Sequence, residues 1–152
     1  KQFDSVHRFI QSGIKEGAKL ELGGDSPKSE DLKDGFFINP TIFSKVTSTM
    51  TIANQEIFGP VISVMTWENY DEMMSIANST EYGLTAGIVT NSLTHAMKTA
   101  EEIECGYIWI NTAGRYASAP YGGWKLSGIG VEECYDELKS YSRVKNINMK
   151  WL

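Results

Sequence analysis

Residues 55–67 read Gln-Glu-Ile-Phe-Gly-Pro-Val-Ile-Ser-Val-Met-Thr-Trp. The Gly-Pro pair inside this stretch is a turn signal, because glycine reaches backbone conformations that other residues avoid and proline fixes its own φ. The apolar run that follows, 61–67, has the length and composition of a buried strand. The stretch therefore predicts a turn that holds a carboxylate, Glu56, and a ring, Phe58, at one end of a buried strand.

Two helical patterns follow this strand. Residues 70–77 and 93–103 both place apolar side chains three and four positions apart, which puts them on one face of a helix. Asn69 and Ser92 precede the two patterns and can accept a hydrogen bond from the first turn, so they are predicted N-caps.

The segments after these helices are short and apolar. Residues 85–90 and 106–110 are each predicted to be strands. Strand, helix, strand, helix, strand with short links is typical of parallel strands joined by helices. The sequence therefore predicts an α/β fold, with a mostly parallel sheet and helical crossovers.

The N-terminal quarter gives weaker signals. Residues 3–14 show helical spacing, and 18–22 can form a short strand. Residues 25–35 are polar and contain a proline, so they predict a surface loop. Residues 36–46 are extended in character, but Pro40 argues against a central strand throughout.

The C-terminal third is mostly irregular. Residues 111–130 are rich in Gly, Ala and Ser and lack periodicity, which in a compact domain is typical of a functional or unstructured segment. Residues 131–138 predict one short helix. The tail, 142–152, alternates between apolar and polar side chains and predicts a C-terminal edge strand with one apolar face. The apolar positions are Val144, Ile147, Met149 and Trp151, and the polar ones are Asn146, Asn148 and Lys150.

Composition narrows the classes of function. The chain has 152 residues, a net charge of −5 and 41% hydrophobic residues, as expected for a soluble domain or part of one. The acidic balance argues against nucleic acid as the main partner, and no apolar run could span a membrane. The N-terminus has neither an initiating Met nor the character of a signal peptide. We therefore expect a part of a longer protein. The two cysteines form neither a CxxC pair nor a disulfide framework, which favours a cytoplasmic setting.

The turn at 55–60 resembles the nicotinamide-site motif of the NAD(P)-dependent aldehyde dehydrogenases. Residues 119–130, Ala-Pro-Tyr-Gly-Gly-Trp-Lys-Leu-Ser-Gly-Ile-Gly, are similar to a second signature near the end of those enzymes. The resemblance covers essentially the whole chain. It implies that residues 1–141 are the distal part of the catalytic domain and that 142–152 form an oligomerisation strand.

The resemblance implies a reaction for the parent enzyme. Members of this family oxidise an aldehyde to a carboxylic acid with water and NAD or NADP, through a cysteine thiolate that attacks the aldehyde. The matching cysteine would lie upstream of this chain, so the chain alone is expected to be inactive. The implied partners are the upstream part of the same protein, a small aldehyde and further copies in a dimer or tetramer.

Three residues would hold the cofactor if the resemblance extends to function. Glu56 matches a glutamate that accepts hydrogen bonds from the nicotinamide-ribose hydroxyls, a task that suits an acceptor-only group. Phe58 would pack near the nicotinamide, and it can equally be a core aromatic. Gln2 matches a glutamine at the ribose, or is a polar residue at a helix start.

Three further residues would face the substrate. Tyr121 and Tyr116 match aromatic side chains that line the aldehyde tunnel, where apolar walls suit a small substrate. Glu132 matches a glutamate assigned to a proton path. The alternative for Glu132 is stabilisation of the first turn of the following helix through the helix dipole.

Neither cysteine and neither histidine of this chain predicts a reactive centre. Cys105 opens a predicted strand and Cys134 lies on a predicted apolar helix face, so both are interpreted as inert core residues. His7 and His95 lie on separate helices without the spacing of metal ligands, so no metal site is expected.

Two other functions stay open at this point. The chain can be a folding and association module without catalysis, whose tail pairs with a partner. It can also belong to a relative that transfers an acyl group to coenzyme A. The sequence leaves open which aldehyde is used and whether the cofactor is NAD or NADP.

Overall fold

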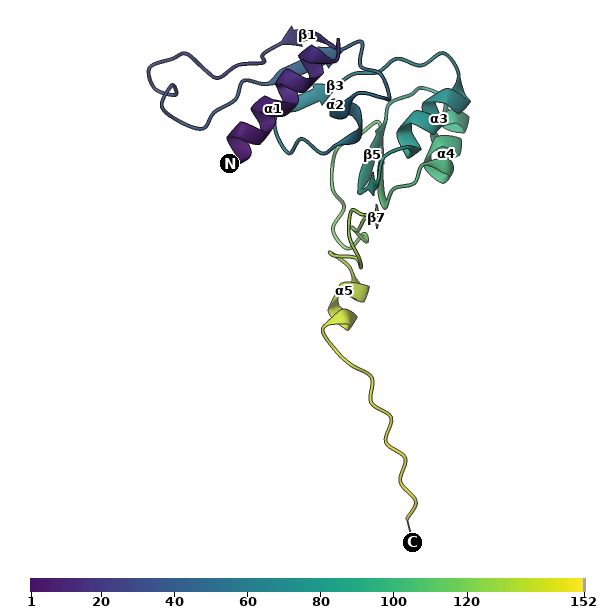
Figure 1. Cartoon of the computed structure of the whole chain (residues 1–152). Coiled ribbons are helices and arrows are strands. Elements are labelled where there is room, and N and C mark those ends of the chain that lie inside the picture. The colour runs from purple at the N-terminus through teal and green to yellow at the C-terminus, as the bar shows by residue number, and fades with distance from the viewer. Residues whose placement is uncertain (152) are drawn as a thin grey trace. The chain divides into compact units, whose positions relative to one another are not determined.

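A computed structural model describes residues 1–151 of the chain (Figure 1). The chain divides into two compact units, Lys1–Ile76 and Ala77–Leu152. Within the described residues, no helix combines the length and the apolar character needed to cross a membrane.

The first unit begins with helix α1, Gln2–Lys15. Its apolar residues repeat with the helical period, so one stripe faces inward and buries Val6, Ile10 and Gly13. The helix ends before Gly17, whose φ of 96° is easy for glycine and costly for other residues. The predicted helix at 3–14 is confirmed.

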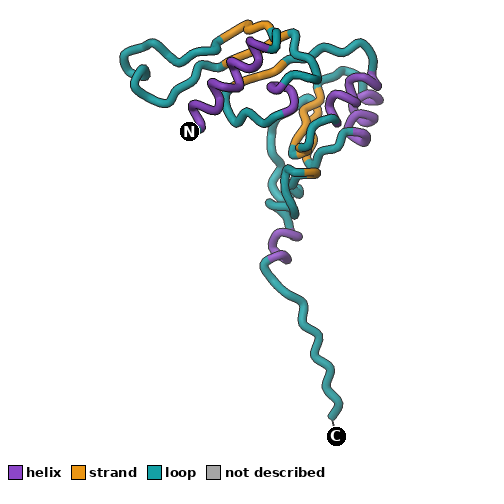
Figure 2. The backbone as a smooth tube through the Cα atoms, viewed as in Figure 1, coloured by secondary structure: helices purple, strands orange, loops and turns teal. Residues whose placement is uncertain are grey.

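Three short strands form the sheet of this unit, in the order β1-β2-β3. The strands are coloured orange in Figure 2. They are β1 (Lys19–Leu22), β2 (Thr41–Ser44) and β3 (Val61–Ser63). β1 pairs antiparallel with β2, and β2 pairs parallel with β3. The crossover between the parallel strands contains the short helix α2, Thr51–Asn54.

The core of the first unit lies where α1, α2 and β2 meet. Phe43 of β2 and Ile10 of α1 are fully buried, and Ile52 of α2 closes the cluster. Gly13 allows α1 and α2 to pack closely, since a β-carbon there would lie 2.8 Å from the Ile52 side chain. The other buried members of this core are Val6, Ala18, Val46 and Met50.

Glu16, just after α1, fixes the start of α2. The backbone N–H and the hydroxyl of Thr51 both donate to the Glu16 carboxylate, at 2.6 and 2.7 Å, and the Ser12 hydroxyl donates as well. These hydrogen bonds, led by that from Ser12, lower the pKa of the Glu16 carboxyl. The N-cap of α2 is Met50, which makes no side-chain capping hydrogen bond, so Glu16 at the end of α1 supplies the missing cap.

The prediction of a long buried strand at 61–67 is wrong in length and in burial. β3 ends at Ser63, and Ile62 and Trp67 are 58% and 55% exposed. The physical reason is missing cover on one face of the sheet: no element of the described chain packs on the outward side chains of this segment. An apolar run shows what a strand could bury but not whether the covering element is present.

Helix α3, Tyr70–Asn78, follows β3 along the chain. The side-chain oxygen of Asn69 accepts a hydrogen bond from the backbone N–H of Glu72 at 3.0 Å. This contact confirms Asn69 as the predicted N-cap.

The second unit is built on a strand–helix–strand motif. β5 (Thr85–Ile88) and β6 (Tyr107–Ile110) pair in parallel and are joined by α4 (Leu93–Glu102). The Ser92 hydroxyl caps α4 by accepting from the backbone N–H of His95 at 3.3 Å. These elements confirm the prediction of an α/β fold with a helical crossover.

A second pair of strands in this unit was not predicted. β4 (Tyr82–Gly83) pairs antiparallel with β7 (Trp124–Lys125). Each has only two residues, too few to leave a periodic pattern in the sequence. β7 lies inside the segment 111–130, which is otherwise irregular as expected.

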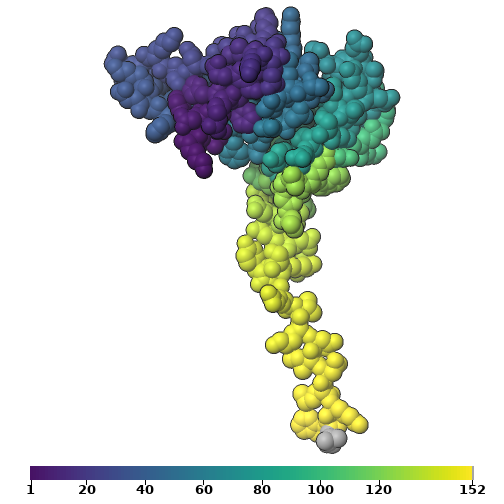
Figure 3. Space-filling model, viewed as in Figure 1, coloured from purple at the N-terminus to yellow at the C-terminus, as the bar shows by residue number. Residues whose placement is uncertain are grey.

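The C-terminal segment departs from its predicted burial. Helix α5 spans Tyr135–Ser140, and Cys134 is its N-cap. Tyr135 and Leu138, which share with Cys134 the face that was predicted to be apolar, are 68% and 67% exposed because no other element of the described chain packs on them. Residues 143–151 form no strand pair among the described residues, and their side chains stand uncovered in Figure 3. Pairing of this tail with another chain stays a prediction.

Candidate functional site

The turn at 55–60 is held from its inner side. Ile57 packs against the core of the first unit. Gly59 lies against Val6, and a β-carbon there would come within 2.6 Å of the Val6 side chain. The Pro60 carbonyl accepts a hydrogen bond from the Thr41 N–H at 2.8 Å. Since alternate positions are anchored inward, Glu56 and Phe58 are directed outward.

Phe58 combines an exposed ring with an unusual backbone conformation. Its φ is 54°, in the left-handed region that residues other than glycine rarely adopt, and the residue is 76% exposed. Burial of the ring cannot stabilise this conformation. Residues held in such a conformation cluster at functional sites, so this turn is a candidate site for a ligand.

Gln2 braces this turn. Its side-chain amide nitrogen donates to the Phe58 carbonyl at 2.8 Å and to the Ile57 carbonyl at 3.3 Å. The structure thereby brings together the three residues predicted at the cofactor. It also adds a role that the sequence did not indicate, because Gln2 fixes the backbone of Phe58 across 56 positions of the chain.

The Glu56 side chain is available to a ligand. Glu56 is exposed, and among residues 1–151 no hydrogen bond or ion pair holds its carboxylate. Beside the same turn lies a groove of about 520 Å³, lined mainly by rings and apolar groups. Its lining includes Phe3, Phe36, Phe37, Phe58 and Gln2. An acceptor-only group beside an aromatic groove suits a ligand that carries hydroxyl donors and a flat ring.

In the second unit, the segment 119–130 is fastened by two polar side chains. The Lys125 ammonium donates to the carbonyls of Asn78 and Thr80 at 2.7 and 3.1 Å and forms an ion pair with Glu104 at 2.6 Å. The Ser127 hydroxyl accepts from the Gly83 N–H at 2.9 Å. Both residues belong to the signature segment, and both hold β7 in place. Sequence reasoning gave them no role, because their partners lie more than 20 positions away.

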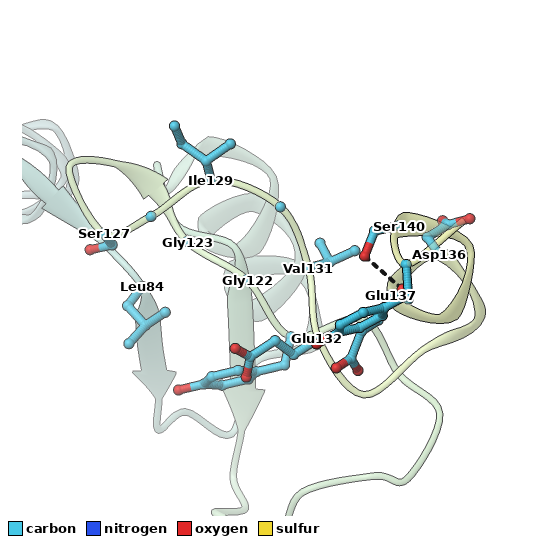
Figure 4. Close-up of a pocket in the computed structure, with 14 residues that line it drawn as sticks. Leu84, Gly122, Gly123, Ser127, Ile129, Val131, Glu132, Asp136, Glu137 and Ser140 are labelled. Carbon is cyan, nitrogen blue, oxygen red and sulfur yellow. Dashed lines mark hydrogen bonds between the residues drawn. The ribbon is translucent and has the colours of Figure 1, made fainter. Parts of the chain in front are cut away.

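Tyr121 and Glu132 are joined by their backbones. The Tyr121 N–H donates to the Glu132 carbonyl at 3.0 Å, and the Glu132 N–H donates to the Tyr121 carbonyl at 2.7 Å. Both line a cavity of about 480 Å³, together with Leu84, Val131 and the glycines at 122–130 (Figure 4). The structure thus places a predicted substrate residue and the predicted proton-path residue in one cavity.

Tyr116 lies apart from this cavity. It is 68% exposed and absent from the lining. Its backbone N–H donates to the Tyr107 hydroxyl at 3.4 Å, and the Tyr107 ring lies 5.4 Å from the ring of Tyr121. Tyr107 therefore contacts both predicted substrate residues. The sequence showed Tyr107 only as one position of an apolar strand.

The two cysteines differ in burial. Cys105 is buried, which confirms it as a core residue, and burial raises the pKa of its thiol. Cys134 is half-buried at the start of α5. His7 contacts Ser26 and Phe3, and the part of the chain that the structure describes contains no group of three His, Cys, Asp or Glu side chains that could hold a metal ion.

Comparison with known proteins identifies a family. Residues 1–147 match the model of the aldehyde dehydrogenase family. Among curated proteins, rat retinaldehyde dehydrogenase 3 is 46% identical over 151 residues, which are 99% of this chain and 29% of that protein. Aldehyde dehydrogenase tropH of Talaromyces stipitatus is 44% identical over 150 residues, 96% of this chain and 29% of that protein.

Solved structures give the same match. The aldehyde dehydrogenase of Mycobacterium tuberculosis complexed with NAD+ superposes with a TM-score of 0.89 at 37% identity, covering 93% of this chain and 29% of that one. The NAD+ complex of the Bacillus cereus enzyme gives 0.87 at 39% identity, covering 95% and 29%. The chain therefore spans about 29% of the length of these relatives.

Proposed function

This chain belongs to the aldehyde dehydrogenase family, and we propose that it is part of an enzyme that oxidises an aldehyde to a carboxylic acid with NAD or NADP. The similar enzymes of M. tuberculosis and B. cereus were solved with NAD+. In this proposal, residues 1–141 are the distal part of the catalytic domain. Residues 142–152 are an assembly strand.

The observation that carries the proposal is the braced turn at 55–60. Gln2 and the inward anchors hold the backbone, so Glu56 and Phe58 present a carboxylate and a ring without further rearrangement. We propose that Glu56 accepts hydrogen bonds from the nicotinamide-ribose hydroxyls and that Phe58 packs beside the nicotinamide. When bound there, NAD(P)+ supplies the hydride acceptor. A fixed ribose fixes the position of that acceptor, and such positioning is a large part of catalysis.

The cavity of the second unit supports a substrate role. We propose that Tyr121 forms part of the aldehyde tunnel and that Tyr116 lies nearer its mouth, since Tyr116 is the more exposed. Glu132 faces the same cavity and can carry a proton between it and solvent. The backbone bridge between Tyr121 and Glu132 would keep the ring and the carboxylate in a constant relation.

The nucleophile belongs to another part of the protein in this proposal. Cys105 is buried with a raised pKa, so its thiol is neither accessible nor ionised. Both cysteines are free of disulfides. That pattern supports a reducing, cytoplasmic setting.

We predict that the 152-residue chain alone shows no aldehyde oxidation, whereas the intact protein reduces NAD+ or NADP+ when an aldehyde is added. The assay follows absorbance of the reduced cofactor, with and without coenzyme A. Turnover by the purified chain would contradict the proposal that the nucleophile belongs to another part of the protein. Turnover of the intact protein only in the presence of coenzyme A would favour the acyl-transferring alternative.

We also predict that the tail at 142–152 assembles the protein into a dimer or tetramer. Unpaired apolar strands associate, and Ile147, Met149 and Trp151 are each more than 70% exposed. Ending the chain after Arg143 should lower the molar mass of the intact protein in light scattering, or its solubility.

A matched pair of variants separates edge pairing from general loss of the tail. Replacing Ile147 and Met149 with lysine alters the apolar face, whereas replacing Asn146 and Asn148 with lysine adds the same charge to the polar face. Only the first pair should reduce the assembly. If both pairs and the truncation leave the molar mass and solubility unchanged, the tail is not an assembly element, and the alternative of an association module falls with it.

A further inference from the structure

The ring of Tyr121 is held by a cation. The guanidinium carbon of Arg115 lies 3.9 Å from the centre of the Tyr121 ring, within the range of a cation–π contact. A second ring, Tyr107, lies 5.4 Å away in a tilted orientation and rests in turn against Trp109 at 5.0 Å. Tyr121 is therefore contacted by β6 and by the irregular segment 111–120.

Arg115 is itself fixed by a carboxylate. Its guanidinium nitrogen Nη2 lies 2.8 Å from Oε1 of Glu133. Glu133 has a φ of 61°, and its backbone N–H donates to the Glu137 carboxylate at 2.6 Å. A residue in the left-handed region persists only where its surroundings determine it, and here the helix α5 provides that restraint.

These contacts close a ring of interactions through the cavity wall. Glu133 follows Glu132 in the chain, and Glu132 is bridged to Tyr121 through two backbone hydrogen bonds. From Tyr121 the path returns through Arg115 to Glu133. Tyr121 is thus restrained at its backbone by the bridge to Glu132 and at its ring by Arg115.

We propose that the Arg115–Glu133 pair positions the ring of Tyr121 for the aldehyde, and that both are positioning residues of the tunnel. This inference rests on the tunnel role proposed above for Tyr121. Its chemical basis is that arginine can stack on a ring while its edge nitrogens bind a carboxylate, so a single side chain serves both partners. Because the Arg115 charge is already matched by Glu133, the cation that holds the Tyr121 ring adds no unpaired positive charge beside it.

The test is steady-state kinetics of the intact protein with a neutral aldehyde. Arg115→Ala should raise the KM for the aldehyde by about two- to tenfold while kcat and the KM for the cofactor stay near their original values, since a looser wall weakens substrate and transition state alike. Arg115→Lys, which keeps a cation within reach of both partners, should recover part of this loss. Loss of folded protein would instead lower the apparent kcat and leave the KM unchanged.

Coupling between the two residues gives a second readout. Glu133→Gln should raise the KM for the aldehyde in the same direction, and the double variant should be little worse than Arg115→Ala, because the two residues act through one contact. If the double variant instead raised the KM by the product of the two single fold-changes, the proposal would be overturned.

Two controls complete the design. Lys139 lies 4.5 Å from the Tyr135 ring and 3.6 Å from Asp136, so Lys139→Ala removes the same kind of contact from α5 and should leave the KM for the aldehyde unchanged. Tyr121→Ala tests the underlying assignment. An unchanged KM in Tyr121→Ala would overturn the tunnel role and this inference with it. A raised KM there, with an unchanged KM in Arg115→Ala, would overturn the positioning role alone.

Discussion

Replacing Gly106 with alanine is expected to destabilise the intact protein by about 3 kcal/mol or more, a large effect for one methyl group. A β-carbon on Gly106 would overlap the carbonyl oxygen of Gly122 and lie 2.8 Å from its carbonyl carbon. The obstacle is backbone, which cannot rotate away as a side chain can.

Neither backbone at this crossing is free to move. The Gly106 N–H donates to the Gly83 carbonyl at 3.1 Å, and Tyr121, next to Gly122, is bridged to Glu132. Thermal unfolding should therefore show a melting temperature several degrees lower. Aldehyde turnover should fall as well, because the same crossing supports Tyr121.

Gly87→Ala is the matched control. Gly87 is an exposed glycine in β5, and a β-carbon there meets no atom within 4 Å. Its effect should stay within about 0.5 kcal/mol. Equal melting temperatures for the Gly106 and Gly87 variants would show that the close backbone crossing does not exist in the protein.

The parts of the fold that sequence predicted are those with local causes. α1 and α4 follow from the spacing of apolar residues, and the Asn69 and Ser92 caps from one side chain and the backbone three positions on. The parallel pairing of β5 and β6 followed from the helix between them. Each of these signals lies within about 25 residues.

The parts that sequence missed depend on distant partners. Gln2 reaches the carbonyl of Phe58, and Lys125 reaches the carbonyls near Asn78. Arg115 and Tyr121 are only six positions apart, but they meet through an irregular turn at 117–118 that leaves no periodic pattern. The two-residue strands β4 and β7 leave no periodic pattern at all. Such features follow from the fold and leave no local signal in the sequence.

The candidate cofactor residues include features that the sequence predicted and features that it did not. The sequence order placed Glu56 and Phe58 at a turn, and the structure confirms that turn and adds its brace. Exposure was not predictable in the same way. Ile62 and the tail at 143–151 were assigned to buried or paired positions, and the described chain contains no element that covers them.

Replacing Glu56 with glutamine is expected to slow hydride transfer in the intact enzyme by about fivefold or more. The amide oxygen can still accept from a hydroxyl, but it lacks the charge that makes such hydrogen bonds roughly twice as strong. Glu56 is exposed and is held by no partner among residues 1–151, so the substitution should leave the melting temperature unchanged. Glu68→Gln, at another exposed carboxylate of the same unit, should change neither rate nor stability.

A single-turnover experiment on Glu56→Gln tests most directly whether the turn at 55–60 positions the cofactor. Enzyme in excess over aldehyde is mixed with saturating cofactor, and formation of the reduced cofactor is followed with normal and with deuterated aldehyde. We predict a slower step that carries the isotope effect of hydride transfer, in a protein of unchanged stability. A hydride step as fast as that of the unmodified enzyme would contradict the proposal that this turn positions the cofactor.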